Sequence, residues 1–251
     1  MKNQLIKTIA PIATALVMLL TPVSSIGGNP TKQEAVSELV HHMGYGAAIH
    51  DFKNFALRGK NKYMDRANAH YGHIKMAIAD LRKLNLSADE KTAVKNIEKV
   101  MADYQVALTK IQALLSSGKA VKDIDKEVKI SDGPATAGLQ TLGAGNGSSL
   151  TQIEYSLGYG GAIHNFKNCV IRTNSSKCTK AKAGFDKTIT ILNGMNGPAA
   201  SEIKTTVTAY INAISTVKKM INEGKSAEEI DGIIKISDGP AKAGIAALRK
   251  H

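Results

Sequence analysis

Residues 44–54 read Gly-Tyr-Gly-Ala-Ala-Ile-His-Asp-Phe-Lys-Asn, and Arg58 follows them. Residues 158–168 read Gly-Tyr-Gly-Gly-Ala-Ile-His-Asn-Phe-Lys-Asn, and Arg172 follows at the same spacing. We call residues 44–58 the first motif and residues 158–172 the second motif. The stretch Lys-Ile-Ser-Asp-Gly-Pro-Ala, which we call the closing stretch, also occurs twice, at 129–135 and at 235–241. Because the two pairs follow the same order, the chain is a tandem duplication.

Sequence around the motifs is typical of helices, since apolar residues recur at spacings of three and four. Gly59 and Gly118 interrupt this pattern, so the spacing predicts helices over 31–57, 61–83 and 87–117, with a fourth from 121 to 142 that is kinked at 131–134. The second half repeats this series. We therefore expect an all-α protein of two tandem up-down-up-down four-helix bundles, each with a kinked fourth helix. Four predicted capping boxes begin helices: Thr31/Glu34, Ser87/Glu90, Thr151/Glu154 and Ser226/Glu229.

The predicted domains follow from the duplication and from the ends of the pattern. Residues 1–25 have a basic start, an apolar run and small residues at 23–25, which is typical of a cleaved signal peptide. The alternative, a membrane anchor, is disfavoured because the run is short and contains Pro11. We expect a first bundle over 26–142, a flexible Gly/Ser linker over 143–149 and a second bundle over 150–251. The mature protein should be periplasmic or secreted, without a transmembrane segment.

The chain is basic, with a formal net charge of +12. Such a balance suits nucleic acid, anionic lipid or polyanionic envelope material. However, the chain lacks Trp, contains few aromatic residues and spreads its lysines along the predicted helices, so it offers no stacking platform for bases. We therefore expect no nucleic-acid partner.

Cys169 and Cys178 are the two cysteines of the chain. In an oxidising compartment a lone pair without CxxC spacing favours a disulfide over a metal site. At the same offset, the first half has Phe55 and Met64, where an apolar contact would have the same effect.

The motifs carry two kinds of residue. On a helix, Tyr45, Ile49 and Phe52 share one face, which explains a packed core. His50, Lys53, Asn54 and Arg58 form another row, rich in hydrogen-bond donors and poor in nucleophiles. This row suits a small anionic ligand held between helices, and Gly44 and Gly46 indicate close helix approach or space for such a ligand. The candidate ligand-binding residues are Tyr45, His50, Lys53, Asn54, Arg58, Tyr159, His164, Lys167, Asn168 and Arg172.

An internal polar network explains the same row without a ligand, with His50 bonded to a carbonyl group or to Asp132. Four further histidines occur in the first half alone, at 41, 42, 70 and 73. His70 and His73 have the spacing of a metal pair, but no carboxylate or cysteine is spaced to complete the set. We expect surface histidines there and no metal site.

The motif Gly-Tyr-Gly-Gly-Ala-Ile-His-Asn-Phe-Lys-Asn with Arg172, followed by the Lys-Ile-Ser-Asp-Gly-Pro-Ala stretch, resembles the periplasmic helical sensor region of some bacterial chemoreceptors and diguanylate cyclases. The resemblance covers nearly all of the predicted mature chain, one copy per half. It implies ligand sensing without chemistry. Those relatives continue into a membrane helix and a cytoplasmic output domain, for which the sequence has no counterpart. Phe55 and Cys169 replace a tyrosine of that pattern, and Asp51 replaces its asparagine.

We therefore expect an exported, non-enzymatic, sensor-like protein that binds a small anionic molecule without a cofactor and could present it to a membrane receptor. The alternative is a periplasmic haem- or metal-binding redox protein with His50 and His164 as ligands, although CxxCH is absent. A third reading is a small secreted enzyme that stabilises a dianion with cationic side chains, for which no carboxylate or glutamine partner is evident.

Overall fold

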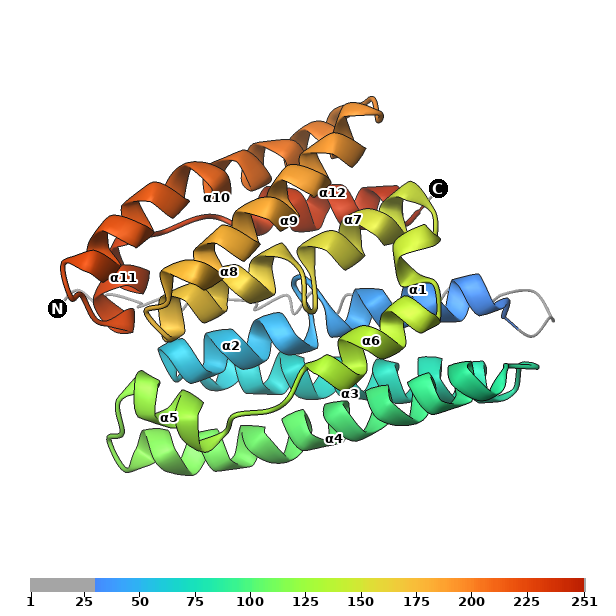
Figure 1. Ribbon diagram of the computed structural model, residues 1–251, viewed down its shortest axis with the longest axis horizontal. Helices are drawn as coiled ribbons and strands as arrows, with labels where there is room; N and C mark the ends of the chain where they lie inside the picture. Colours follow the sequence, from blue (N-terminus) through green and yellow to red (C-terminus); the bar gives the residue numbers. More distant parts are fainter. Residues whose placement is uncertain (1–29, 251) are drawn as a thin grey trace, which may run out of the picture.

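The computed structural model describes residues 30–250, and all secondary structure in that range is helical (Figure 1). The predicted all-α class is confirmed. The predicted signal peptide lies outside the described residues. Among residues 30–250, no helix combines the length and the apolar composition needed to cross a membrane.

The helices form two series in the same order, which matches the duplication. The first series is α1 (Lys32–Met43), α2 (Ala48–Arg58), α3 (Asn61–Arg82), α4 (Ala88–Ser116), α5 (Val121–Glu127) and α6 (Gly133–Thr141). After a short 3-10 turn, η1 (Ala144–Asn146), the second series is α7 (Ser149–Leu157), α8 (Ala162–Ile171), α9 (Ser175–Asn193), α10 (Pro198–Asn222), α11 (Ala227–Ile233) and α12 (Gly239–Leu248).

The prediction of one continuous helix over 31–57 is wrong. The chain leaves the helix between α1 and α2, where Gly46 has φ of 77°, and the second half breaks in the same way with Gly160 at 75°. Glycine adopts this left-handed conformation without the steric cost that a side chain would add. The predicted kinked fourth helix is likewise two helices, α5 and α6, with residues 129–132 non-helical between them.

The Gly/Ser stretch over 143–149, which is predicted to be a linker, is partly helical. It contains η1, in which Ala144 is fully buried. The cap of α7 is Ser148, whose hydroxyl accepts a hydrogen bond from the Thr151 N–H, so the predicted Thr151/Glu154 capping box is wrong. The other three predicted boxes are present at Thr31, Ser87 and Ser226.

Corresponding helices make corresponding contacts in the two series. Helices α1 and α2 pack on α3, and α4 packs on α6; α7 and α8 pack on α9, and α10 packs on α12. The two series also contact each other through α1 with α7, α2 with α8 and α11, and α8 with α5. Figure 1 shows α2 and α8 side by side in the middle of the molecule. The two motif helices therefore lie at the contact between the series.

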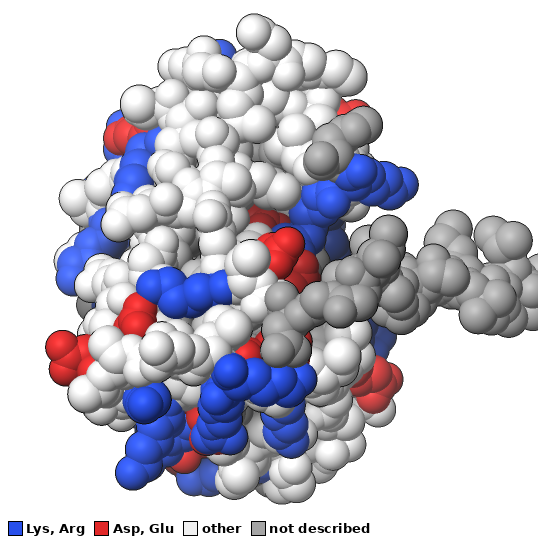
Figure 2. Space-filling model, turned by 90° about the vertical axis from the view of Figure 1, so that its right-hand side faces the viewer, with Lys and Arg blue, Asp and Glu red and all other residues white. Residues whose placement is uncertain are grey.

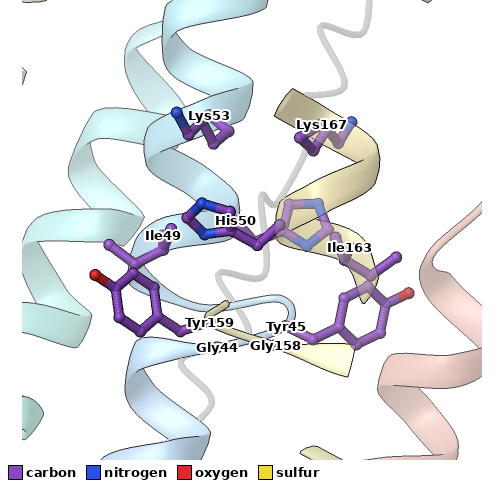
Figure 3. Close-up of a pocket in the computed structure, with 10 residues that line it drawn as sticks. Gly44, Tyr45, Ile49, His50, Lys53, Gly158, Tyr159, Ile163 and Lys167 are labelled. Atoms are coloured by element: carbon purple, nitrogen blue, oxygen red, sulfur yellow. The ribbon is translucent and has the colours of Figure 1, made fainter. Parts of the chain in front are cut away.

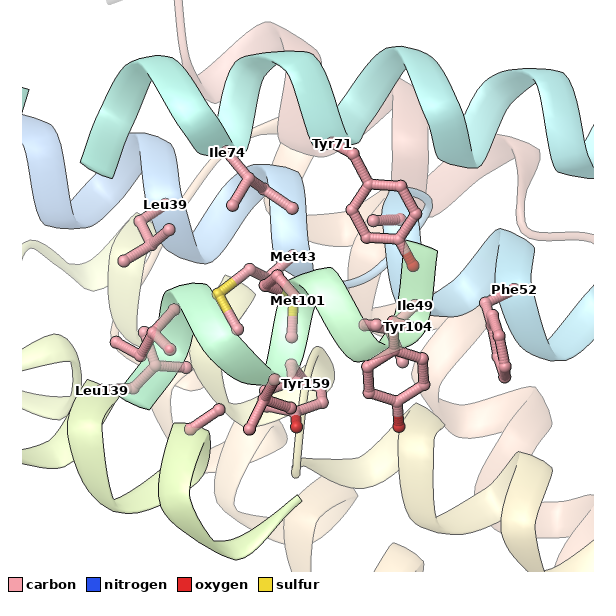
Figure 4. Packing of buried hydrophobic residues seen from close by; sticks show 14 of the residues in the cluster. Leu39, Met43, Ile49, Phe52, Tyr71, Ile74, Met101, Tyr104, Leu139 and Tyr159 are labelled. Carbon is pink, nitrogen blue, oxygen red and sulfur yellow. The ribbon is translucent and has the colours of Figure 1, made fainter. Parts of the chain in front are cut away.

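Each motif contributes its tyrosine to the apolar core of the opposite half. Tyr159 of the second motif packs in the core of the first series, among Met43, Met101 and Leu139 (Figure 4). Tyr45 of the first motif belongs to the core of the second series. Each motif therefore contributes an aromatic side chain to the opposite half, so the apolar packing couples the two halves.

The predicted disulfide is present between Cys169 and Cys178, and it links the end of α8 to the start of α9. In the first half, Phe55 and Met64 belong to one apolar core, with Phe55 buried and Met64 partly buried. Among residues 30–250, most charged side chains are exposed or partly exposed, whereas five are buried: Asp51, Lys53, Asp125, Glu154 and Lys167. In the lower part of the face seen in Figure 2, Lys and Arg groups are interspersed with Asp and Glu.

Candidate functional site

The two motifs meet at their first glycines. A Cβ atom placed on Gly158 would lie 2.8 Å from the Cα of Gly44, and one placed on Gly44 would lie 3.2 Å from the Cα of Gly158. Figure 3 shows the two glycines in adjacent turns, with the tyrosines of the motifs on either side. The close approach that was one of the two explanations for Gly44 and Gly46 is present at Gly44, whereas Gly46 lies in the helix break with a positive φ.

Asp238, at the start of α12, is held by side chains of both halves. Its Oδ1 accepts hydrogen bonds from the hydroxyl groups of Tyr45, at 2.7 Å, and Tyr210, at 2.6 Å. Its Oδ2 lies 3.3 Å from Nε2 of His50. The Nδ1 of His50 accepts a hydrogen bond from the Gly46 N–H at 3.0 Å, which leaves the ring proton on Nε2, facing the carboxylate.

Asp132, at the start of α6, has the equivalent surroundings. Its Oδ1 accepts from the hydroxyl groups of Tyr159, at 2.7 Å, and Tyr104, at 2.6 Å, and its Oδ2 lies 3.2 Å from Nε2 of His164. We call these two sets the Asp132 cluster and the Asp238 cluster. In each, the tyrosine and histidine of one motif contact the aspartate of the opposite half. An internal polar network is therefore present, but His50 contacts Asp238 and not Asp132 as that hypothesis predicted.

These contacts affect the protonation of the two aspartates and of His164. Burial works to raise the pKa of Asp132, but His164 and the two tyrosine hydroxyls outweigh it and hold that pKa below its usual range. The same balance, with His50, lowers the pKa of Asp238. Burial lowers the pKa of His164 despite the nearby Asp132. Both aspartates are therefore ionised near neutral pH, where they act as acceptors for the tyrosine hydroxyls.

The motif arginines also pair with the opposite half. Arg58 binds Asp231 of α11 through two hydrogen bonds, of 2.8 and 2.9 Å. Arg172 binds Asp125 of α5 through bonds of 2.7 and 3.3 Å. The repeated sequence does not reveal these two aspartates, because Asp125 and Asp231 precede the identical residues of the closing stretch.

The motif lysines are buried, at 4% and 5% exposure for Lys53 and Lys167. The Nζ of Lys53 lies 3.4 Å from Oδ1 of Asp125, whereas Lys167 forms no hydrogen bond or ion pair within residues 30–250. Burial lowers the pKa of both ammonium groups. Figure 3 shows these ammonium groups at opposite sides of the space between the motif helices.

A small cavity lies between the two motifs. Its volume is about 10 Å³, and both copies of Gly, Tyr, Ile, His and Lys line it: Gly44, Tyr45, Ile49, His50, Lys53, Gly158, Tyr159, Ile163, His164 and Lys167 (Figure 3). This volume is about that of one water molecule. It has no room for a haem or for an organic ligand.

A larger cleft of about 330 Å³ opens beside the first motif. Three of the predicted ligand-binding residues line it, namely His50, Asn54 and Arg58. The other lining residues come from the break before α2 and from α2, α3 and α12: Gly46, Asp51, Lys62, Tyr63, Arg66, Asp238, Gly239 and Lys242. The structure thus places part of the predicted row in a cleft, while Tyr45 and Lys53 line the small cavity instead.

The cleft is cationic where it opens to solvent. Arg66 is paired with the buried Asp51 through bonds of 2.9 and 2.5 Å, and Arg58 is paired with Asp231. Lys62 and Lys242 are exposed and form no ion pair within the described residues. The internal repeat does not reveal these two lysines, because Ser176 and Thr136 occupy the equivalent positions in the other half. They are therefore the charges available to an incoming anion.

Two further features shape the cleft. The ring of Tyr63 has three cationic groups within 6 Å of its centroid, those of Arg58 at 5.9 Å, Lys62 at 5.3 Å and Arg66 at 5.1 Å. The Oδ1 of Asn54 is buried and has no hydrogen-bond partner among the described residues. Buried polar atoms are nearly always paired, so this oxygen is an exception beside the cleft.

The second half differs at the equivalent positions. The two motifs are 114 residues apart, which we call the motif offset, and at this offset Lys177 is equivalent to Tyr63 and Asn165 to Asp51. The two closing stretches are 106 residues apart, and at this second offset Thr136 is equivalent to Lys242. His164, Asn168 and Arg172 keep the places of the motif row, and Oδ1 of Asn168 is again buried without a partner. The two halves therefore share the row but not the side chains around it.

Comparisons with models of protein families, with curated proteins and with solved structures find no match to this chain.

Proposed function

We propose that this chain is an exported, non-enzymatic protein that binds a small anionic molecule in the cleft beside His50, Asn54 and Arg58. In this proposal the two halves are four-helix modules of a sensor-like type, and a membrane receptor is the partner to which the ligand is presented. The observation that carries the proposal is the cleft itself, which combines a volume of about 330 Å³ with two lysines that form no ion pair within residues 30–250.

Size and charge both support a small anion. Sites for small molecules commonly have volumes of about 300–1,000 Å³, a range that includes this cleft. Lys62 and Lys242 offer point charges to a carboxylate or phosphate, and the Tyr63 ring offers an apolar wall.

The repetition of the polar row is a weaker argument than the cleft. Arg58, Arg172 and Lys53 pair with aspartates, and the motif histidines face Asp132 and Asp238. Internal ion pairs, between the halves for the arginines and histidines and within the first half for Lys53, therefore account for much of the row without a ligand. The alternative of a haem or redox metal between His50 and His164 is not favoured, because both Nε2 atoms face carboxylates and the cavity between the motifs is about 10 Å³.

The test is isothermal titration calorimetry of the whole protein with inorganic phosphate, succinate and citrate. We expect at least one of these probes to bind with a Kd below about 1 mM. The double variant Lys62→Glu/Lys242→Glu should weaken that binding at least about tenfold, because it reverses both unpaired charges.

Lys75→Glu is the matched control, because Lys75 is exposed on α3 but does not line the cleft. It changes the net charge by −2, half the change of −4 in the double variant, and it should bind the probe within about twofold of the unmodified protein. Equal binding by the double variant and the unmodified protein, or no binding of any probe, would reject the cleft as an anion site.

A further inference from the structure

Four imidazole rings gather in the first half, and none of them lines the cleft or belongs to the Asp132 or Asp238 cluster. His41 and His42 come from α1, and His70 and His73 come from α3. The ring centroid of His42 lies 4.8 Å from that of His41, 5.3 Å from that of His70 and 4.4 Å from that of His73. We call these four residues the histidine cluster. His73 is exposed as predicted, but the other three are only partly exposed.

The fold does not require these histidines. At the motif offset, the second half has Tyr155, Ser156, Gly184 and Lys187 in their places. Helices α7 and α9 nevertheless pack on each other as α1 and α3 do. A gathering of four of the seven histidines of the chain at a place where the equivalent half has none indicates a role other than holding two helices together.

The geometry of two of the rings is that of a ligand pair. The Nδ1 atoms of His42 and His70 lie 3.0 Å apart. Two nitrogens bound at about 2.0–2.1 Å to a tetrahedral ion are separated by roughly 3.3 Å, so a shift of a few tenths of an ångström would admit the ion. The Nε2 of His42 lies 3.4 Å from Oε2 of Glu38, the carboxylate–histidine arrangement that orients a metal ligand.

We propose that His42 and His70 bind a divalent transition-metal ion, of the class Zn²⁺, Cu²⁺ or Ni²⁺, with His73 as third ligand and water completing the shell. In the conformation described, no three His, Cys, Asp or Glu side chains of residues 30–250 are arranged around one point. The exposed ring of His73 must therefore turn about its side-chain bonds to join the pair, which its position on the surface allows. Imidazole suits these ions better than it suits Mg²⁺ or Ca²⁺.

The test is titration of the whole protein with Zn²⁺ by calorimetry, and with Cu²⁺ by electron paramagnetic resonance. We expect one ion per chain and, for Cu²⁺, a spectrum with at least two nitrogen ligands. The variant His42→Gln/His70→Gln should lower the affinity at least about tenfold. Because that variant changes partly buried side chains, circular dichroism must show unchanged helicity.

His73→Gln provides a second variant that does not disturb the fold, since His73 is exposed. It should weaken Zn²⁺ binding while keeping two nitrogen ligands on Cu²⁺, and Lys75→Gln on the same helix should change neither. Binding that survives loss of His42 and His70, or the absence of stoichiometric binding in the unmodified protein, would overturn the proposal. Neither outcome bears on the anion cleft, which shares no residue with the histidine cluster.

Discussion

Single polar side chains of the motifs matter here through what they contact in the opposite half. Asp132 shows this most clearly, because Tyr159 and His164 reach it from the second motif while Tyr104 reaches it from α4. A hydrogen bond to an ionised carboxylate contributes more than one between neutral groups, roughly 1.5–3 kcal/mol. The repeated tyrosines and histidines are therefore expected to stabilise the contact between halves whether or not a ligand is bound.

Tyr159→Phe tests whether a single tyrosine hydroxyl group stabilises the contact between the halves. It removes the donor to Asp132 and keeps the ring, so we expect the free energy of unfolding to fall by about 1.5–3 kcal/mol in urea denaturation. Tyr45→Phe should give a similar loss through Asp238.

Tyr155→Phe is the control, because Tyr155 is partly buried and its hydroxyl forms no hydrogen bond within the described residues. It should change the free energy by less than about 0.5 kcal/mol. A Tyr159→Phe protein as stable as this control would show that the carboxylate contact contributes nothing.

Among the elements, the breaks between α1 and α2 and between α7 and α8 decide where the halves touch. In a continuous helix, the residues of the first motif would follow the axis of α1 and would not turn toward the second motif. The break instead lets Gly44 and Gly158 approach backbone to backbone and directs each tyrosine into the opposite core. Apolar periodicity continues through the break, which is why periodicity alone predicted a single helix over 31–57.

Gly158→Ala tests the crossing. Its new Cβ would lie 2.6 Å from the carbonyl oxygen of Glu154 and 2.8 Å from the Cα of Gly44, both of them backbone atoms that cannot easily move. We expect a loss of about 1–3 kcal/mol in the free energy of unfolding, as for other overpacked substitutions. Gly72→Ala is the matched control.

Gly72 lies within α3, and a Cβ there would meet no atom within 4 Å. Alanine should therefore raise the free energy of unfolding by up to about 1 kcal/mol, because it restricts the unfolded chain and favours helix. Two losses of equal size would mean that the glycines are needed for a reason other than the crossing.

For the whole molecule, the buried ionisable groups set how stability depends on pH. The pKa values of Asp132, Asp238 and Asp125 are lowered in the folded state, in each case by partners that outweigh burial. Their stabilisation is complete above the ordinary value of 3.8 and is lost as the pH falls below it. His164, whose pKa burial lowers from 6.5, adds a loss that begins below that value, since the unfolded chain then binds the proton more readily.

We therefore expect the free energy of unfolding to decrease from about pH 6.5 to pH 3, measured by urea denaturation at each pH. Asp132→Asn should be less stable at pH 7 by about 1–3 kcal/mol and should show a shallower decrease below about pH 5. A variant whose curve runs parallel to that of the unmodified protein would show that Asp132 does not contribute to the acid sensitivity.

Some residues that line the cleft belong to the repeated motif, and others come from the helices around it. The internal repeat selected His50, Asn54 and Arg58, which do line the cleft. It could not select Lys62, Arg66 or Lys242, because these side chains are not repeated and reach the cleft only through the packing of α3 and α12. Nor could it show that Arg58 is already paired with Asp231, a residue 173 positions away.

By itself, the sequence determined the all-helical class, the duplication, three of the helix caps and the disulfide, because each depends on local spacing or on residue types close in the chain. The tertiary structure alone decided that the halves exchange contacts, that Asp132 faces His164 while Asp238 faces His50, and that the four early histidines meet. The reason is physical: an ion pair depends on distance in space, and two halves with the same residues can pair within themselves or across, with the choice made by the helix breaks and the packing of the core.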